Sequence, residues 1–472
     1  MSYVALDVFQ QLRPDDIHWM LASSELRTIS ANGVLVREDD PSETIFFIAD
    51  GLFEVYVYGG SSSRLKVGQL GPGEIIGEIS WLDRKPISAS VRAVEVSSVI
   101  ALSIASLERK LAADPGFAAR LFRAIATLTA ERLRTTTSQV RRAELGGQRA
   151  APADSAAATV VLDKIRELKR LVAAQEGGAG PVPDQFADQI REAFAAVEQE
   201  IGPQGLQSGD KFADALQTEL LPLIRLSATG ERCFAQPRGY AGDYQTIDMI
   251  YGNKPAGTGR VGPVLDRCLL NLAAAKAVRN RRHRLASEIL ASYAATAKEF
   301  HVASLACGPA REIFDAFEKA DESSRLQVSC IDIDREALGQ VTARAEEQKL
   351  AQQVQTFHGN LIYLATGRQD LDLAPQDLIY SLNLTDYFSD EMAVTLIDWI
   401  YDELRPGGRA ILGNFHPRNP SRGLMDHVLD WRLTHRDEAA MNQLFVASKF
   451  AKPSSRIIFE DEGIYLLAEC TK

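Results

Sequence analysis

The sequence predicts a multidomain protein: an N-terminal β-barrel or jelly roll, a long helix, a middle helical module and a C-terminal α/β domain. Three observations support this prediction. Residues 1 to about 110 contain short apolar, β-branched runs separated by glycines, and residues 160 to 225 show a charged helical pattern. Residues 296 to 472 alternate strand-like and helix-like segments. Such alternation indicates a parallel sheet with helices on both faces.

The expected boundaries are 1–115 for the β domain, 116–145 for the long helix, 146–159 for a small-residue linker, 160–295 for the helical module and 296–472 for the α/β domain. The linker prediction depends on GGQRAAPADSAAAT, which is rich in small residues. Phe117, Leu121, Ile125 and Leu128 recur at helical spacing in the long helix.

Composition excludes some functions. The chain of 472 residues carries a formal net charge of -11, which argues against a nucleic-acid binder that relies on a broad basic surface. No run approaches the roughly 20 apolar residues that span a bilayer. The five cysteines show no metal-ligand spacing, so we expect reduced thiols, no metal site and a cytoplasmic protein.

The stretch from Val302 to Asp334 predicts a strand, a turn, a helix and a second strand. Gly308 lacks a β-carbon, so a ligand can approach the turn where free backbone N–H groups point. Asp332 ends the second strand and can accept hydrogen bonds from both hydroxyls of a ribose. Since the turn lacks a basic residue and the GxGxxG pattern, we expect a nucleoside without a pyrophosphate.

Ligands of open α/β sheets bind beyond the carboxyl ends of the strands. That rule selects, in strand order, Ala306, Cys307 and Gly308; Asp332, Ile333 and Asp334; Asn360 and Leu361; Asn383 and Tyr387; and Asn414 and His416. Two of them have a simpler interpretation, which we favour. Asp334 precedes a helical pattern and is expected to cap it, and Cys307 is expected to be a small filler beside the turn.

SLACGPARE and the following Asp332 resemble motif I and its acid in class I S-adenosylmethionine-dependent methyltransferases, with Ser304 in place of the usual leading acid. LRPGGRAILGNF resembles the motif that leads into their fifth strand. The resemblance covers roughly the last 180 residues. It implies a Rossmann-like domain with a seven-stranded sheet, S-adenosylmethionine as cofactor, Asp332 on the ribose, Asn360 facing the adenine amine and Asn383 in the methyl-donor pocket. Further cofactor contacts are expected from Ala306, Cys307, Gly308, Ile333 and Leu361.

In the N-terminal part, LGPGEIIGEISWLDRKPISASVRA resembles the cyclic-nucleotide-binding domain of catabolite-activator-type regulators. Gly77 and Glu78 match the family's ribose-binding GE pair, but Ile87 stands where the phosphate-binding arginine is expected. A nucleotide or other effector bound at Gly77 and Glu78 is one alternative. A degenerate barrel kept for packing and dimer formation is the other, which we favour. The resemblance implies that the long helix pairs two subunits into a homodimer.

PRGYAGDYQTIDMIY, SLACGPARE and NLTDYFSD together resemble bacterial methyltransferases that make 3-hydroxy fatty-acid methyl esters as signals. This resemblance implies carboxyl O-methylation of a small-molecule acceptor. A carboxylate is already ionised near neutral pH and needs no strong base. The expected catalytic residues are His416, Tyr240, Tyr387 and Asn383, and the expected substrate contacts are Arg238, Tyr244 and Asn414.

Two other function classes remain. A non-catalytic sensor would bind S-adenosylmethionine or a nucleotide and signal to a partner. A transcription factor is disfavoured, because no helix-turn-helix pattern follows the long helix and the overall charge is acidic.

Overall fold

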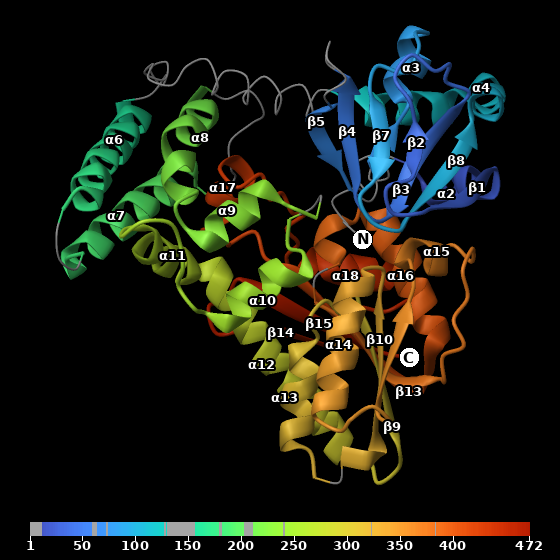
Figure 1. The fold of residues 1–472 in the computed structure, drawn as a ribbon. Helices are drawn as coiled ribbons and strands as arrows, with labels where there is room; N and C mark the ends of the chain where they lie inside the picture. The colour runs from blue at the N-terminus through green and yellow to red at the C-terminus, as the bar shows by residue number, and fades with distance from the viewer. Residues whose placement is uncertain are drawn as a thin grey trace.

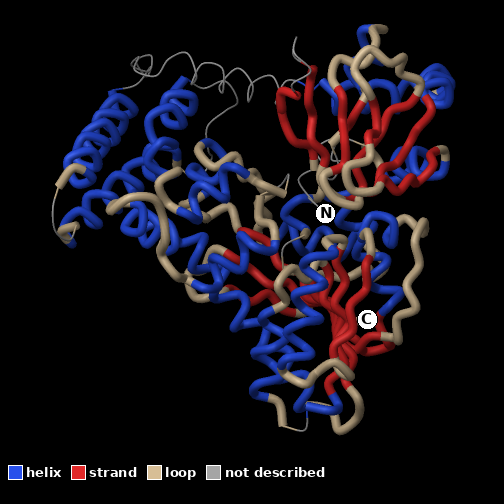
Figure 2. The backbone as a smooth tube through the Cα atoms, in the orientation of Figure 1, coloured by secondary structure: helices blue, strands red, loops and turns tan. Residues whose placement is uncertain are grey.

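The computed structural model describes residues 12–58, 64–71, 74–126, 129, 156–178, 182–202, 211–238, 241–321, 323–382 and 384–472. Three bodies are visible along the chain: an N-terminal β domain, a helical module and a C-terminal sheet domain covered by helices (Figure 1). Strands gather in the first and last of these, and helices fill the middle one (Figure 2). Among the described residues, no helix combines the length and apolarity needed to cross a membrane.

Two antiparallel sheets form the N-terminal domain, as predicted for a jelly roll. One has the order β1-β8-β3-β6 and the other the order β2-β7-β4-β5. Phe46, Ile48 and Phe53 fill the space between them because alternate residues of each strand face inward. The strands are β1 (Ser24–Ile29), β2 (Val34–Val36), β3 (Thr44–Asp50), β4 (Phe53–Tyr58), β5 (Arg64–Leu70), β6 (Ile75–Ile76), β7 (Ser90–Ala93) and β8 (Ser97–Ser103), with helices α2 (Pro14–Ala22), α3 (Glu78–Asp83) and α4 (Ile104–Ala113).

The predicted long helix and linker fall largely outside the described residues. Residues 115–126 are helical, and Phe117, Leu121 and Ile125 of this segment are buried, as their spacing predicts. The linker prediction runs too far at its end, because α6 (Ala156–Glu176) already begins within it. Three consecutive alanines start this helix, and alanine has the highest helix propensity.

The helical module continues with six further helices: α7 (Asp184–Ile201), α8 (Lys211–Ile224), α9 (Ala228–Ala235), α10 (Tyr244–Gly252), α11 (Gly262–Leu270) and α12 (Ala273–Ala294). The apolar faces of α6, α7 and α8 pack on one another, away from the sheet. α10 and α12 lie instead beside the C-terminal domain (Figure 1). The module therefore places two of its helices next to the expected ligand site.

The C-terminal domain contains the predicted seven-stranded sheet, in the order β11-β10-β9-β12-β13-β15-β14. β9 to β13 are parallel to one another, whereas β15 runs antiparallel to both β13 and β14. Its strands are β9 (Phe300–Leu305), β10 (Leu326–Asp332), β11 (Val354–His358), β12 (Gln376–Ser381), β13 (Leu404–Phe415), β14 (Arg456–Phe459) and β15 (Tyr465–Thr471). Its helices are α13 (Arg311–Lys319), η2 (Ser323–Arg325), α14 (Arg335–Glu347), α15 (Leu361–Ala365), η3 (Thr385–Tyr387), α16 (Asp390–Glu403), α17 (Arg422–His427) and α18 (Glu438–Ala447).

The β domain contacts the C-terminal domain near the carboxyl ends of β10 and β11. Asp50, at the end of β3, lies 3.5 Å from Nε2 of His358 and 3.8 Å from Nε of Arg335. Arg368, just after α15, donates a hydrogen bond to the carbonyl of Leu21 in α2. Figure 1 shows the β domain against α15 and α16.

Candidate active site

The turn between β9 and α13 is held in an uncommon backbone conformation. Ala306, Gly308 and Ala310 all have positive φ angles, of 52°, 52° and 46°. The two alanines each cost roughly 1–2 kcal/mol in this left-handed region. A β-carbon added to Gly308 would meet only Tyr244, at 3.9 Å, so the turn presents bare backbone to open space. Strained backbone facing a cavity is typical of a binding site.

Asp332 is anchored to this turn. Its Oδ2 accepts a hydrogen bond from the Gly308 N–H at 2.8 Å, and its Oδ1 accepts one from the Asp334 N–H at 2.9 Å. Burial raises the pKa of the Asp332 carboxyl, and the two backbone donors oppose that shift. The predicted proximity of glycine and acid is therefore present, and the carboxylate is held rigidly at the end of β10.

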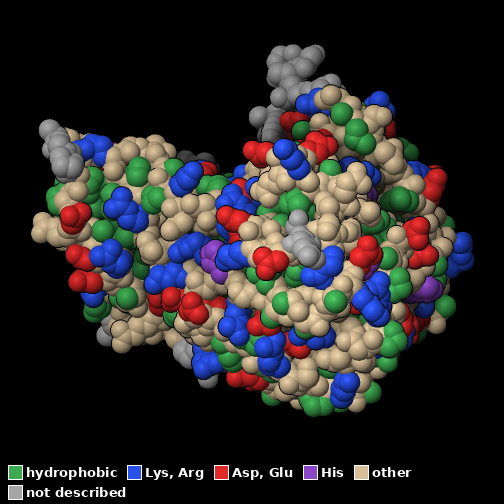
Figure 3. All heavy atoms as spheres, turned by 90° about the horizontal axis from the view of Figure 1, so that it is seen from below, with side chains coloured by type: hydrophobic (Ala, Val, Ile, Leu, Met, Phe, Trp, Pro, Cys, Tyr) green, Lys and Arg blue, Asp and Glu red, His purple; other side chains and the backbone are tan. Residues whose placement is uncertain are grey.

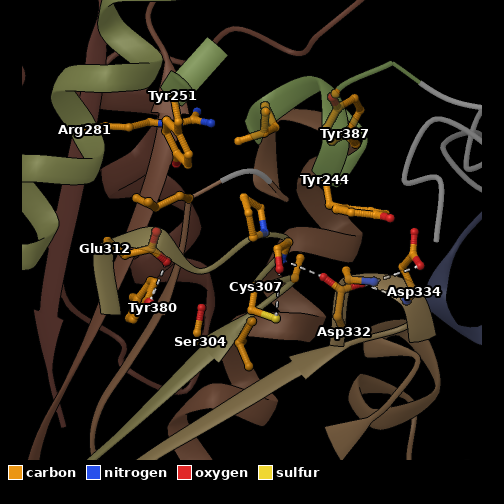
Figure 4. Close-up of a pocket in the computed structure, with 18 of the residues that line it drawn as sticks. Tyr244, Tyr251, Arg281, Ser304, Cys307, Glu312, Asp332, Asp334, Tyr380 and Tyr387 are labelled. Carbon is orange, nitrogen blue, oxygen red and sulfur yellow. Dashed lines mark hydrogen bonds between the residues drawn. The ribbon is translucent and has the colours of Figure 1, made fainter. Parts of the chain in front are cut away.

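A cleft opens over the turn. The residues that line it come from the module and from six strands or helices of the sheet domain (Figure 4): Ala241, Gly242, Tyr244, Ile247, Tyr251, Arg281, Ser304, Leu305, Ala306, Cys307, Gly308, Pro309, Glu312, Asp332, Asp334, Ala337, Tyr380, Leu382 and Tyr387. The structure thus brings six of the predicted residues into one cleft: Ala306, Cys307, Gly308, Asp332, Tyr244 and Tyr387.

Cys307 and Asp334 have the simpler roles favoured for them. A hydrogen bond with the neighbouring Cys330, together with burial, raises the pKa of the Cys307 thiol well above its usual value, so it is no thiolate. Oδ1 of Asp334 accepts hydrogen bonds from the Glu336 and Ala337 N–H groups and caps α14.

Two tyrosines and an arginine stand at the rim. The Tyr387 hydroxyl donates to the Ala241 carbonyl and accepts from the Trp431 indole at 3.0 Å. Tyr244 donates to Glu336. Arg238 forms a bidentate ion pair with Asp334 at 2.9 Å and reaches Glu336 at 2.7 Å, so its guanidinium is held at the entrance beside the Tyr244 ring.

Three predicted cofactor residues lie next to the cleft but do not line it. Ile333 and Leu361 are buried in the core. Asn360 caps α15 by accepting a hydrogen bond from the Ile362 N–H. Its Nδ2 is buried, and among the described residues it has no hydrogen-bond partner. Tyr240 and Asn383, both predicted to be catalytic, lie outside the described residues.

The structure does not place His416 or Asn414 in the cleft. Both ring nitrogens of His416 are engaged: Nε2 lies 3.1 Å from Glu438, and Nδ1 accepts from the backbone and side chain of Arg418. Asn414 is buried and bonded to Phe415, Thr434 and Arg436. The prediction used only the position after β13. That position does not show that Glu438 contacts His416 and that Arg436 donates to Asn414, because both partners are distant in sequence.

Four titratable lining residues were not among the predicted site residues: Tyr251, Arg281, Glu312 and Tyr380. Arg281 lies in the charged stretch NRRHR, residues 280–284, and is only 1% exposed. Glu312 ends SLACGPARE, so its position in that motif was the available signal. Tyr380 in β12 donates to Glu312 at 2.8 Å.

A second cavity lies beyond Tyr387 and is almost wholly apolar. It is lined by Thr229, Gly230, Cys233, Ile250, Leu269, Leu272, Ala274, Ala275, Val278, Phe415, Ser421, Leu424, Met425, Leu429 and Trp431. We call it the apolar pocket. Because Tyr387 lines the cleft and its partner Trp431 lines the apolar pocket, this pair forms a shared wall.

In the β domain, Gly77 and Glu78 begin α3, as the predicted effector site requires. Gly77 has a φ of 92°, and Glu78 is buried. Ile87 is also buried, and its backbone bonds to that of Asp39 and Asp40. An apolar side chain therefore occupies the position where an arginine is expected to bind a phosphate.

No group of three or more histidine, cysteine or acidic side chains that could bind a metal ion occurs in the part of the chain that the structure describes. All five cysteines are free and buried. On the face viewed from below, acidic and basic side chains are interspersed (Figure 3).

Comparison with known proteins adds two relatives and one structure. The HTH-type transcriptional regulator Cmr of Mycobacterium tuberculosis is 26% identical over 175 residues, which are 36% of this chain and 68% of that protein. A cyclic nucleotide-gated potassium channel of Mesorhizobium japonicum is 28% identical over 114 residues, so this chain spans 30% of the channel's length and the match covers 24% of this chain. The structure of a possible exported protein from Bordetella parapertussis aligns with 62% of this chain and 99% of that one, at 20% identity and a TM-score of 0.44.

Two family models match the chain. A cyclic nucleotide-binding domain matches residues 26–114, from within β1 to just past α4. The other model matches residues 189–468, from within α7 to the last strand, and so includes most of the helical module with the sheet domain. Because this second match covers more than half of the chain, the protein belongs to the family described as "Putative methyltransferase", with a cyclic nucleotide-binding domain before it.

Proposed function

We propose that this protein transfers the methyl group of S-adenosylmethionine to the carboxylate of a small apolar acid. The observation that carries the proposal is the 2.8 Å bond between Gly308 and Asp332, at the head of a cleft that adjoins the apolar pocket. The bond puts a ribose acceptor beside bare backbone, and the apolar pocket provides room for a hydrocarbon.

The residues present fit this methyl donor. Asp332 would hold the ribose hydroxyls, and the Gly308 turn leaves space for the nucleoside. The turn itself, residues 306–310, contains no cation for a diphosphate.

When bound, the cofactor supplies an electrophilic methyl group that an in-line nucleophile can displace. The chain's own task is then to position the acceptor and to exclude water. Tyr387 and Trp431 are both buried and fix each other across the shared wall. Burial raises the pKa of the Tyr387 hydroxyl, which stays protonated. Its single O–H donates to the Ala241 carbonyl and would have to turn from it to reach an acceptor oxygen.

The apolar pocket supports an acceptor with a hydrocarbon tail. Each buried methylene contributes about 0.8 kcal/mol, so a tail of several carbons would bind with useful affinity. A tail lying there would direct its carboxylate past Tyr387 toward the cleft. A carboxylate needs no general base, which agrees with an engaged His416. We favour a 3-hydroxy fatty acid as the acceptor.

The test is a labelled-methyl assay with saturated and 3-hydroxy acids of increasing length. We expect kcat/KM to rise about threefold to fourfold per methylene until the apolar pocket is full. Ala275→Leu should fill part of the pocket and depress activity on the longest acids, whereas Ala291→Leu, on the exposed side of the same helix, should not.

Asp332→Ala should weaken cofactor affinity at least tenfold. Cofactor binding without turnover on any acid would instead favour a sensor.

We further propose that the β domain regulates the site. Its Asp50 contacts Arg335 and His358, which lie beside the strand end that carries Asp332. Glu95, between β7 and β8, is close enough to Arg238 and Glu336 at the rim for their charges to act on its carboxyl. A rearrangement of the β domain, by an effector at Gly77 and Glu78 or by dimer formation, would therefore alter the entrance. Asp50→Asn should change the cofactor affinity of the full-length protein, and an unchanged affinity would argue against this route.

A further inference from the structure

Two buried, oppositely charged side chains face the cleft on the side away from Asp332. Arg281 of α12 is 1% exposed and Glu312 of α13 is 3% exposed. Figure 4 shows Arg281, Tyr251, Glu312 and Tyr380 on one side of Cys307, and Asp332 and Asp334 on the other. Charges are rarely buried this deeply unless an opposite charge or strong hydrogen bonds compensate them.

Phenols are the neighbours of both charges that the hydrogen bonds and ring contacts identify. The charges of Asp386 and Arg282 also act on Arg281 and Glu312, respectively. Arg281 hydrogen-bonds Tyr251 and lies over the Tyr465 ring, with its centre 4.6 Å from the ring centroid. Glu312 accepts a hydrogen bond from Tyr380. The charges of Arg281 and Glu312 both act on the Tyr251 hydroxyl. A ligand anion bonded to Arg281 and a ligand cation bonded to Glu312 would add a direct ion pair to each.

Ser304 adds a second indication. It occupies the position at which the resembling methyltransferases carry an acid, and a serine cannot neutralise an ammonium group. The structure places the Tyr380 hydroxyl beside Ser304 and bonds it to Glu312. Glu312, in the helix that follows β9, therefore places a carboxylate on the side of the cleft where β9 has a serine.

We propose that Arg281 and Glu312 bind the amino-acid end of the methyl donor, Arg281 holding its α-carboxylate and Glu312 its α-ammonium group. The inference depends on the proposed function, because it presumes that the nucleoside lies against Gly308 and Asp332. An acceptor acid would satisfy Arg281 alone, whereas an α-amino acid carries both complementary charges on one carbon. Burial raises the pKa of the Glu312 carboxyl, and a bound ammonium group would oppose that shift.

Calorimetry with two nucleosides separates this inference from the proposed function. S-adenosylhomocysteine carries the amino-acid end, and 5′-methylthioadenosine lacks it. Arg281→Met and Glu312→Gln should each weaken the binding of S-adenosylhomocysteine about tenfold to a hundredfold. That loss of affinity corresponds to one charge-assisted hydrogen bond. Both variants should bind methylthioadenosine within about threefold of wild type, which also shows that they are folded. Arg284→Met, on the exposed face of α12, is the matched control.

Decarboxylated S-adenosylmethionine separates the roles of the two residues, because its amino-acid end keeps the ammonium group and lacks the carboxylate. Glu312→Gln should weaken the binding of this compound, and Arg281→Met should leave its affinity unchanged. The inference is overturned if Arg281→Met and Glu312→Gln bind S-adenosylhomocysteine like wild type, or if they weaken both nucleosides equally. Normal cofactor affinity with a raised KM for the acid would assign Arg281 to the acceptor. If neither nucleoside binds the wild-type protein, the proposed function itself fails.

Discussion

Buried polar side chains around the cleft differ in how completely the protein satisfies them. Asp332 has a backbone donor for each oxygen, and His416 has partners on both nitrogens. Asp386, the middle residue of η3, has a hydrogen-bond partner for only one carboxyl oxygen. Its Oδ1 accepts from the Phe415 N–H, while its Oδ2 has no hydrogen-bond partner among the described residues. Its environment therefore favours the neutral acid.

Asp386 should make stability depend on pH. Burial raises the pKa of Asp386 to about 7, from near 3.9 when unfolded. Between these values the folded state binds more protons, so this contribution to stability is complete below about pH 4 and is lost as pH rises through about 7. Asp386→Asn keeps the Phe415 bond and removes the titration. Relative to wild type, the variant should gain up to about 4 kcal/mol between pH 4 and pH 7.5.

Urea unfolding of both proteins at several pH values measures this difference. Asp372→Asn, an exposed aspartate of the same domain, is the control and should follow wild type. If the curves of Asp386→Asn and wild type run parallel, Asp386 is ionised in the folded protein and the inference from its burial is wrong.

Among the elements, the turn from β9 to α13 combines strain with exposure to the cleft. Ala306 and Ala310 hold left-handed conformations that glycine would adopt without cost. Gly308 has the same conformation but faces open space rather than packed atoms. The turn's shape is therefore imposed by its surroundings, chiefly the bond to Asp332, and the single glycine lies where a ligand must approach.

Gly308→Ala and Ala310→Gly should act in opposite ways. The first adds a β-carbon at a φ of 52°, costs about 1 kcal/mol in stability and places a methyl group in the cleft. We expect it to weaken S-adenosylhomocysteine by more than tenfold. Ala310→Gly relieves strain but loosens the unfolded chain, so stability should change by less than about 1 kcal/mol and affinity hardly at all. Equal affinities of the two variants would show that the nucleoside does not touch Gly308.

For the whole molecule, the central question is what the β domain responds to. It matches the cyclic nucleotide-binding domain model over residues 26–114 and contacts the sheet domain through Asp50 and Arg368. Its Gly77 and Glu78 have the expected positions, but the buried Ile87 offers a phosphate neither charge nor hydrogen bonds.

Cyclic AMP should therefore raise the melting temperature of the wild-type protein by less than about 1 °C. Ile87→Arg should lower it in the absence of nucleotide, because the new charge is buried without a partner. Cyclic AMP should then give a dose-dependent rise in this variant, since a ligand that binds only the folded state stabilises it. Differential scanning fluorimetry measures both effects. Arg84→Ile tests whether Arg84 binds the phosphate in place of the missing arginine. A clear rise with wild type would contradict the argument from Ile87.

Local sequence was sufficient for the fold and for part of the site. Periodicity and turn residues predicted a β-rich N-terminal domain and a C-terminal parallel sheet with helices, because side-chain alternation and strand–helix alternation leave few fold classes. The seven strands of the second were implied by the resemblance. Gly308 and Asp332 could be predicted together because both follow strands that are neighbours in a parallel sheet. Asp334 could be predicted as a cap because its partners are two and three residues away.

Tertiary structure alone decided which polar side chains remain available to a ligand. His416 was expected in the site, yet Glu438 and Arg418 engage both of its ring nitrogens. Arg281 was not among the expected site residues, yet it is buried and lines the cleft. The apolar pocket likewise joins residues from Thr229 to Trp431 that no local pattern connects. The reason is physical: burial and charge compensation depend on groups distant in the chain, whereas periodicity reports only on near neighbours.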